Sequence, residues 1–485
     1  MKVLKTFVIV LVLALAWYCP AQAQWSALKN TPPIKASTAL LLTDGTVMCQ
    51  DLNAIDWWKL TPDSSGSYVN GTWTEIASMR NPRLYYASGV LASGLVFVAG
   101  GEFSGTTVPV ELDAAELYDP VGDAWYDLPT PGWGHIGDAP CTILSDGSVI
   151  LGDIESPQTA ILDPNFFFWT PSGLKNDPSS SEETWTLLPD GTVLTIDCTD
   201  HPESEIYDPS VDFWFDIGPS TGAWGGDPVE AASIEIGPAI LQPMGDVIAF
   251  GASGHNNYYF PATGTWRRAP DFPVDPNNGL HYGIKDGPAS LLPFGGVLCA
   301  AGPVDGIQND YLGPTVFFEF MNGKFTQVAA PPTAFPNLAP FNWRMLLLPT
   351  GEVMATNGTG EVFLYSHIGL PDDRWRPTVS QWPTVASAGT TNTITGTQFN
   401  GLSQAVCYGD DAAAATNYPL VRLTNINTHH VRYARTANHS TMAVATGNMS
   451  VSTQFTIPSD IDRGETKLEV VANGLASKPV RINIQ

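Results

Sequence analysis

Apolar runs and glycine turns alternate through the first 350 residues of the chain. Seven times a short apolar run ends at a glycine turn, and Val or Leu follows within two residues. The turn glycines, spaced 44 to 56 residues apart, are Gly45, Gly94, Gly147, Gly191, Gly245, Gly295 and Gly351. Repetition at roughly 40–50 residues is typical of β-propellers and solenoids. The pattern therefore predicts one ring of small β-sheets.

Each repeat continues with three further strands. A second strand follows the glycine hairpin, a third ends at an Asp-Pro turn such as Tyr118-Asp119-Pro120, and a fourth carries an aromatic residue such as Trp125. The seventh repeat lacks a fourth strand, whereas Trp25-Ser26-Ala27-Leu28 near the start resembles Trp73-Thr74-Glu75-Ile76. We therefore expect seven four-stranded blades over residues 24–369, with the N-terminal strand completing the last blade and removing its open edge.

The pattern changes after residue 369. Residues 370–383 contain three prolines and no repeat, which is typical of a linker. Residues 384–485 are rich in Thr, Asn and Val, and segments such as Val451–Ile457 alternate between apolar and polar positions. About 100 residues of this kind predict an immunoglobulin-like β-sandwich. The expected fold class is all-β, a propeller followed by a sandwich.

The N-terminus carries the features of a secretory signal. Lys2 and Lys5 precede an apolar run over residues 7–16, and Ala21-Gln22-Ala23 forms a small-x-small cleavage site. No later segment is long and apolar enough to span a membrane. We therefore expect residues 1–23 to be removed and the protein to be secreted as a soluble monomer.

Composition and charge narrow the function classes. Apolar residues make up 44% of the chain, and the formal net charge is −26. Such an acidic surface repels phosphate backbones, which argues against a nucleic-acid partner. Five cysteines follow the predicted cleavage site, an odd number without a CxxC motif, and we expect them to be buried and unpaired.

Two of the blades resemble those of a known family. Arg83–Gly94, followed by Val98-Ala99-Gly100-Gly101, and Phe341–Gly351 are similar to blades of the kelch family, and within it of galactose oxidase and its relatives. The segment from Cys407 to Ser477 is similar to the C-terminal domain of those enzymes. The resemblance implies a seven-bladed kelch-type propeller with an immunoglobulin-like tail, and it covers nearly the whole chain.

The same resemblance implies a copper site that this sequence does not complete. The family's site uses two tyrosines, one of them joined to a cysteine, and two histidines. Tyr85 and His429 match one tyrosine and one histidine, but Phe341 and Asn342 stand at the other two positions. No cysteine lies near Ala36, where the joined cysteine is expected. We therefore predict no radical-copper chemistry, no catalytic residue and no cofactor.

The glycine turns also locate candidate residues at the axis of the ring. The innermost strand of each blade ends at its turn glycine, so residues nine or ten positions earlier lie at the mouth of the central channel. Four consecutive blades have a carboxylate there. The candidate ligand-binding residues at this mouth are Arg83, Tyr85, Asp138, Glu182, Glu235, Asp286, Asn342, Trp343 and His429.

These candidates favour a binding protein over an enzyme. Converging carboxylates suit a hard cation, an amine or a polyol, and Tyr85 or Trp343 could form a stacking wall. We predict recognition of a carbohydrate or protein ligand, with a cation as a further occupant of the acidic ring. The alternatives are carboxylates that are merely solvated, an oxidase of the galactose/glyoxal type, and a hydrolase or lyase that uses the acidic ring.

Overall fold

The regular secondary structure of the described residues is almost entirely β-strand. The structure is a computed structural model that describes residues 24–485, apart from 309, 333–334, 336, 368 and 409–412. The predicted signal segment, residues 1–23, lies outside the described residues. Within the described ranges only two short 3₁₀ helices occur, η1 (Pro340–Asn342) and η2 (Asp373–Trp375). No helix there is long and apolar enough to cross a membrane.

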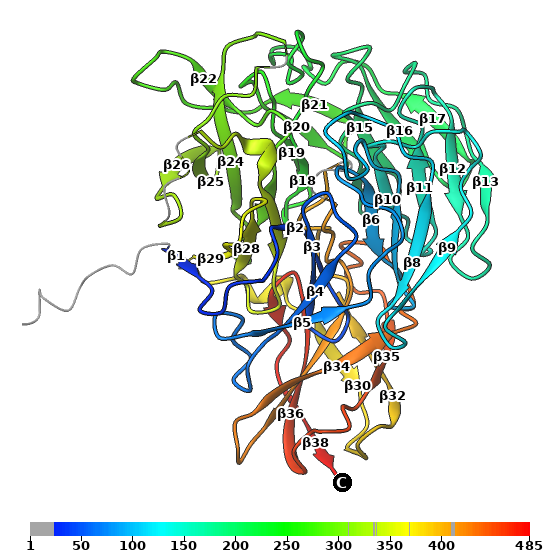
Figure 1. Cartoon of the computed structure of the whole chain (residues 1–485). Helices are drawn as coiled ribbons and strands as arrows, with labels where there is room; N and C mark the ends of the chain where they lie inside the picture. Colours follow the sequence, from blue (N-terminus) through cyan, green and yellow to red (C-terminus); the bar gives the residue numbers. More distant parts are fainter. Residues whose placement is uncertain (1–23, 309, 333–334, 336, 368, 409–412) are drawn as a thin grey trace, which may run out of the picture.

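Residues 24–366 form a seven-bladed β-propeller (Figure 1). Blade 1 comprises β2 (Ala36–Leu41), β3 (Val47–Asp51), β4 (Trp57–Thr61) and β5 (Thr72–Ile76). Blade 2 comprises β6 (Ala87–Val90), β7 (Val96–Ala99), β8 (Ala115–Asp119) and β9 (Ala124–Leu128). Blade 3 comprises β10 (Cys141–Ile143), β11 (Val149–Gly152), β12 (Thr159–Leu162) and β13 (Trp169–Pro171). Blade 4 comprises β14 (Thr186–Leu187), β15 (Val193–Ile196), β16 (Ser204–Asp208) and β17 (Phe213–Asp216). Blade 5 comprises β18 (Ala239–Leu241), β19 (Val247–Ala249), β20 (Asn257–Phe260) and β21 (Thr265–Arg268). Blade 6 comprises β22 (His281–Gly283), β23 (Ala289–Leu291), β24 (Val297–Val304), β25 (Val316–Met321) and β26 (Lys324–Val328). Blade 7 comprises β27 (Arg344–Leu347), β28 (Val353–Thr356), β29 (Phe363–Ser366) and β1 (Gln24–Ala27).

The N-terminal strand is the outermost strand of blade 7. β1 pairs with β29 in antiparallel register, Trp25 opposite Tyr365. The Trp25 indole donates a hydrogen bond to the Ala329 carbonyl oxygen at 2.7 Å, and its ring lies 4.9 Å from that of Phe317 in blade 6. The strand therefore both completes one blade and packs against its neighbour.

The aromatic residues of the fourth strands pack within and between blades. In blades 2 and 4 the tyrosine before the Asp-Pro turn contacts the tryptophan of the next strand, with ring centroids 5.1 Å apart for Tyr118 and Trp125 and 5.2 Å apart for Tyr207 and Trp214. The Trp125 indole also donates to the Ala77 carbonyl oxygen, at the end of blade 1. This repeated contact buries apolar surface that a single small sheet would leave exposed.

The C-terminal strands form one nine-stranded sheet. They are β30 (Thr378–Gln381), β31 (Val385–Ala386), β32 (Thr391–Thr397), β33 (Leu420–Asn425), β34 (Val431–Ala437), β35 (Val451–Thr456), β36 (Gly464–Ala472), β37 (Leu475–Ala476) and β38 (Val480–Ile484). The sheet curls around its own core, which includes Ile394, Val421 and Phe455. β34 pairs with β33 along its first half and with β35 along its second half. The strand order is thus that of one curled sheet, and the immunoglobulin-like sandwich stays a prediction.

This sheet begins earlier than the sequence pattern indicated. β30 lies inside the segment 370–383 that was expected to be a linker, and it pairs with β32. Pro377 and Pro383 flank the strand without interrupting it. Prolines at the ends of an edge strand are compatible with pairing, because they remove no hydrogen bond from its interior.

The C-terminal sheet covers the face of the ring that carries the glycine hairpins (Figure 1). Met442 N–H donates to the Ser145 carbonyl oxygen at 2.9 Å, and Thr436 N–H donates to that of Thr43 at 3.1 Å. Gly45, at φ 76°, lies so close to the Tyr433 ring that a Cβ atom there would be 2.4 Å from it. Residue 45 therefore requires glycine both for its backbone conformation and for this contact.

A loop from the C-terminal sheet closes one end of the central channel. Gln404 accepts a hydrogen bond from Leu187 N–H in blade 4 at 2.8 Å and donates to Thr142 Oγ1 in blade 3 at 2.6 Å. The Tyr408 hydroxyl donates to the Ile236 carbonyl oxygen at 2.7 Å. Thr142 and Leu187 lie in the innermost strands β10 and β14, and Ile236 lies shortly before the innermost strand β18. Residues 402–408 therefore form the floor of the channel, and its mouth opens on the opposite face.

Candidate ligand-binding site at the axial mouth

A cavity of about 280 Å³ lies at the mouth of the channel. It is lined by Tyr85, Glu102, Phe103, Asp138, Glu182, Glu235, Asp286, Tyr311 and Phe341. Six of these residues precede the innermost strands of six consecutive blades, 2 to 7: Tyr85, Asp138, Glu182, Glu235, Asp286 and Phe341. The repeat thus brings equivalent positions of different blades to one point on the axis.

The backbone at these positions is unusual. Tyr85, Glu182 and Asp286 have positive φ values of 55°, 62° and 55°. In the left-handed region such residues cost about 1 kcal/mol or more relative to glycine. The same conformation recurs at equivalent points of three blades, where it turns each side chain toward the axis. Backbone strain of this kind is concentrated at functional sites.

Three carboxylates converge in the cavity. Glu182, Glu235 and Asp286 each offer an oxygen, and these oxygens all lie within 4.8 Å of one another. Glu235 is buried. Like charges at this separation in a partly desolvated cavity repel strongly, so the group favours a cation, a proton or hydrogen-bond donors between its members.

Tyr311 supplies a hydroxyl to the same group. Its hydroxyl donates to Glu235 Oε1. Burial raises the pKa of the Tyr311 phenol, and the nearby carboxylates of Glu235 and Asp286 raise it further. The phenol therefore stays protonated and remains a donor. The Lys285 Nζ lies over the Tyr311 ring, 4.7 Å from its centroid, in a cation–π contact.

Aromatic rings form the remaining walls. The rings of Tyr85 and Phe103 meet edge to face at 5.9 Å, and those of Tyr311 and Phe341 meet at 5.1 Å. Arg344, which is buried, places its guanidinium carbon 5.3 Å from the Tyr85 centroid and donates to the Phe341 carbonyl oxygen at 2.6 Å. The cavity thus combines acidic groups with aromatic surface.

The structure brings together five of the nine candidate residues, namely Tyr85, Asp138, Glu182, Glu235 and Asp286. Arg83 is not at the mouth. It is fully buried, and its guanidinium pairs with Glu116 at 2.9 Å. The chain is not extended at Tyr85, whose φ is 55°, so the direction of Arg83 does not follow from alternation along a strand, and its guanidinium points into the blade.

Asn342 and Trp343 are also corrected, because the chain forms a 3₁₀ turn here and does not continue as an extended strand. Asn342 lies in η1 and its side chain donates to the Ala339 carbonyl oxygen at 3.3 Å. Trp343 is 1% exposed and packs edge to face against Phe317, with centroids 5.1 Å apart. Neither side chain lines the cavity, and Trp343 serves the contact between blades 6 and 7.

His429 also lies elsewhere. It is exposed in the turn between β33 and β34, where its N–H donates to the Asn425 carbonyl oxygen. The part of the C-terminal region that enters the channel is the loop beginning at residue 402, which carries Tyr408 and no histidine among its described residues. The motif-based placement of His429 was therefore wrong.

Four lining residues were not among the candidates: Phe341, next to the chosen Asn342, and three residues from loops. Glu102 and Phe103 come from the β7–β8 loop, and Tyr311 comes from the β24–β25 loop. Both loops join a second strand to a third, and their lengths differ from blade to blade. The glycine spacing therefore gave no signal for them.

The lining residues do not fit a radical-copper centre. Among the described residues, no histidine or cysteine lines the cavity, and Phe341, which does line it, offers no oxygen to a metal. All five cysteines in the described part of the chain are buried and unpaired. Burial raises the pKa of the Cys49 thiol to about 12, so a thiolate ligand is disfavoured there.

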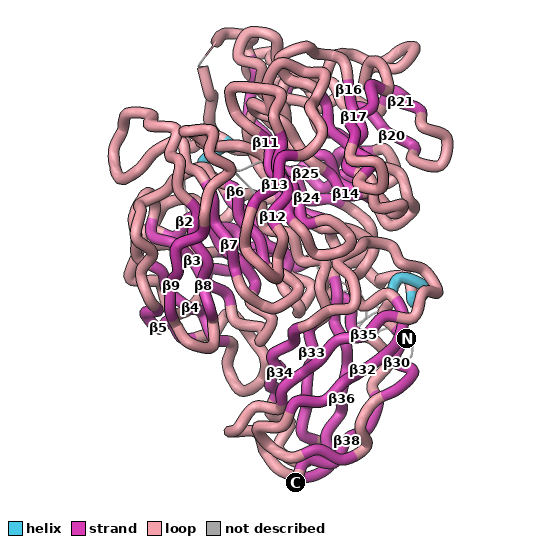
Figure 2. The backbone as a smooth tube through the Cα atoms, turned by 90° about the vertical axis from the view of Figure 1, so that its right-hand side faces the viewer, coloured by secondary structure: helices cyan, strands magenta, loops and turns pink. Residues whose placement is uncertain are grey.

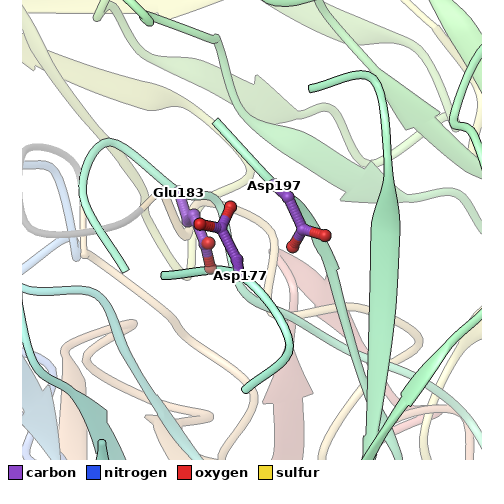
Figure 3. A group of neighbouring side chains, drawn as sticks. All are labelled: Asp177, Glu183 and Asp197. Carbon is purple, nitrogen blue, oxygen red and sulfur yellow. The ribbon is translucent and has the colours of Figure 1, made fainter. Parts of the chain in front are cut away.

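A second carboxylate group lies inside blade 4 (Figure 3). Oxygens of Asp177, Glu183 and Asp197 also approach within 4.8 Å of one another. Lys175 already occupies this group: its Nζ lies 2.8 Å from Glu183 Oε1 and 3.2 Å from Asp197 Oδ1. Burial raises the pKa values of both carboxyl groups. An internal ammonium therefore already balances the charge of this second group.

The chain is similar to kelch-repeat proteins at low identity. No protein-family model matches it. Two F-box/kelch-repeat proteins of Arabidopsis thaliana match parts of it, one with 46% identity over 57 residues and the other with 29% identity over 142 residues. These matches cover 12% and 28% of this chain, and 14% and 28% of the relatives. The chain thus spans less than a third of either relative.

Two solved structures are similar at the level of the fold. A fungal alcohol oxidase of the AA5 family in complex with copper is 15% identical, with a TM-score of 0.36, and the match covers 93% of this chain and 85% of that one. YCF48 bound to D1 peptide is 12% identical, with a TM-score of 0.47, over 73% of this chain and 98% of that one. Neither likeness bears on function.

Proposed function

We propose that this protein is a recognition protein whose axial cavity binds a protonated amine presented by a larger carbohydrate or protein ligand, without radical-copper catalysis. The observation that supports this most directly is the approach of three carboxylates within 4.8 Å of one another in a cavity with aromatic walls. The proposal concerns binding alone, and it assigns no catalytic residue.

The chemistry of the cavity suits an ammonium group. A primary ammonium has three donors, which matches the three carboxylates of Glu182, Glu235 and Asp286. Its charge would also relieve the repulsion among them. The faces of Tyr85 and Phe103 add cation–π attraction. A volume of about 280 Å³ lies just below the usual range for whole drug-sized ligands, so one small group would enter while the rest of the ligand stays outside.

Calorimetric titration of the full chain tests this proposal. Glucosamine and Nα-acetyl-lysine methylamide present the same amine from a sugar and from a peptide, and they distinguish the two sources. We expect at least one of them to bind, and its N-acetylated counterpart not to bind. The double variant Glu182→Gln/Asp286→Asn should weaken binding at least about 10-fold. Asp146→Asn, in a glycine hairpin on the opposite face, is the matched control.

Other results would replace the proposal. Equal binding of the acetylated and free amines would contradict the role of the charge. Tight Ca²⁺ binding that excludes the amines would assign the carboxylates to a metal instead. Bound copper with release of hydrogen peroxide would identify an oxidase. Turnover of a glycoside that is lost in Asp138→Asn, with the fold intact, would identify a hydrolase or lyase.

The location of the protein, its oligomeric state and its domain organisation are also part of the proposal. We infer secretion from the leader-like residues 1–23, and a monomeric state. We also infer that residues 24–369 form the recognition unit, and that residues 384–485, together with β30 of the segment 370–383, act as an immunoglobulin-like support. The loop of residues 402–408 supports this division, because it closes the channel on the side of the C-terminal sheet.

A further inference from the structure

The outermost strands of blades 2 to 4 expose aromatic side chains at repeat positions that are polar in other blades. Each fourth strand has an inward aromatic residue, and the residues directly before and after it point outward. In blades 2 to 4 these outward positions include Tyr126, Phe168, Phe213 and Phe215, which are 45–55% exposed. The equivalent positions in blades 1, 5 and 6 are Thr72, Thr74, Thr265, Arg267, Lys324 and Thr326. The repeat itself therefore does not require the aromatic residues.

These aromatic residues belong to one face of the molecule, which we call the outer wall: Tyr126, Phe166, Phe168, Phe213 and Phe215. Figure 2 shows β9, β13 and β17 on the side of the ring that faces the viewer. The Trp169 indole donates to the Pro129 carbonyl oxygen at 2.7 Å, which joins β13 to the end of β9. Gly173 N–H donates to Asp212 Oδ1 at 3.0 Å, which joins the end of β13 to the start of β17.

The charge of the blades that form the outer wall is mainly negative. Residues 84–216, which span blades 2 to 4, contain 23 Asp and Glu but only one Lys or Arg. That one residue, Lys175, is buried among carboxylates. Asp216 is exposed on β17, and Asp163 is half-buried in the turn that leads to β13. Exposed cations lie at the borders of these blades: Arg80 pairs with Asp127 of β9 at 2.6 Å, and Arg267 and Arg268 lie on β21 of blade 5.

We propose that the outer wall is a docking surface for a basic polypeptide segment that carries lysine and arginine among apolar residues. The exposed rings would supply apolar contact and cation–π attraction, and the negative field would select the sign of the partner and accelerate its approach. A second copy of this chain would be repelled, because its own wall has the same charge. This surface lies on the outer strands, away from the axial cavity, and the proposal does not depend on the amine site.

The test uses the full chain and a defined probe. A fluorescein-labelled dodecapeptide of alternating lysine and leucine is titrated in 50 mM and 300 mM NaCl, with an alternating glutamate and leucine peptide as the opposite-charge control. We expect the basic peptide to bind, more weakly at high salt, and the acidic peptide not to bind. Binding of both peptides, or of neither, would overturn the proposal.

Two sets of variants locate the peptide. Phe213→Thr/Phe215→Thr installs residues that blade 1 carries at the same positions, so the fold should tolerate it, and we expect at least about 10-fold weaker binding. Asp163→Asn/Asp216→Asn keeps the side-chain oxygens that cap local turns and should weaken binding mainly at low salt. Unchanged affinity in the phenylalanine variant, with an unchanged melting temperature, would refute the outer wall as the site.

The remaining outcomes are also decisive. Glu182→Gln/Asp286→Asn should leave peptide binding intact, and loss of binding in that variant would move the peptide to the axial cavity. Self-association in analytical ultracentrifugation that disappears with Phe213→Thr/Phe215→Thr would make the wall an interface between copies and would also overturn the proposal.

Discussion

His439 is a buried imidazole that the fold keeps neutral. It is 8% exposed, its Nδ1 is 2.8 Å from Thr453 Oγ1, and its ring is parallel to that of Tyr418. Burial lowers the pKa of His439 to about 3. The unfolded chain therefore binds a proton at this residue below about pH 6.5, whereas the folded chain does not.

This difference predicts how stability depends on pH. As the pH falls from 6.5 toward 3, the unfolded state gains a proton and the folded state loses relative stability, by up to about 1.4 kcal/mol per pH unit. The variant His439→Gln should lose about 2 kcal/mol less than the parent between pH 6.5 and pH 4.5. Urea unfolding at both values measures this, and parallel losses in the two proteins would contradict the account.

At the scale of single residues, sequence reasoning succeeded where the repeat supplied the register. Asp138 and Asp286 were found because their distance from a turn glycine places them at the axis. Arg83 and Trp343 were misplaced because the backbone beside them is not extended: Tyr85 has a positive φ and Phe341 lies in η1, and the sequence shows neither feature. Tyr311 could not be found, because its loop has no counterpart of equal length in the other blades.

Among the secondary-structure elements, β1 tests how the ring closes. Trp25 is 6% exposed and contacts both Phe317 and Tyr365. The variant Trp25→Ala should reduce the free energy of unfolding by about 3–5 kcal/mol, because it leaves a cavity between blades 6 and 7 and removes an indole hydrogen bond. Chemical denaturation measures the loss.

The control for this variant is an exposed indole. Trp224, in the connection between blades 4 and 5, is 87% exposed. Trp224→Ala should change stability by less than about 0.5 kcal/mol. Equal losses in the two variants would mean that β1 adds nothing to closure of the ring.

Blade elements were predictable because the glycine hairpin and the aromatic strand each occur seven times, and an Asp-Pro turn follows the third strand in three blades. A glycine hairpin, an Asp-Pro turn and an aromatic strand are weak signals alone, but together they set the order of the strands. The C-terminal sheet offers no such repetition. Pairings such as β33 with β36 join distant segments, and β34 changes partners midway, which local alternation cannot reveal.

At the scale of the whole molecule, Gln404 links the propeller to the C-terminal sheet. It is buried, and it bonds to Leu187 and Thr142 of two adjacent blades. Gln404→Ala leaves both partners unsatisfied, at a cost of about 1–3 kcal/mol for each. We expect one calorimetric transition in the parent protein and the same single transition at lower temperature in the variant.

Gln381→Ala, at an exposed position of β30, is the control and should leave that transition unchanged. Two separate transitions, only one of which shifts in Gln404→Ala, would show that the two parts unfold independently and that the channel loop does not couple them.

The pairing of β1 with β29 also sets an order of events during synthesis. Trp25 and Tyr365 pair although 340 residues separate them in the chain. At about 5–20 residues per second, β1 has no partner for roughly 20–70 s after it is made. During that time its backbone groups can pair with any other free edge. Chain completion, rather than the local folding of any blade, therefore limits when the ring closes, and slow production prolongs the period in which nascent chains can aggregate.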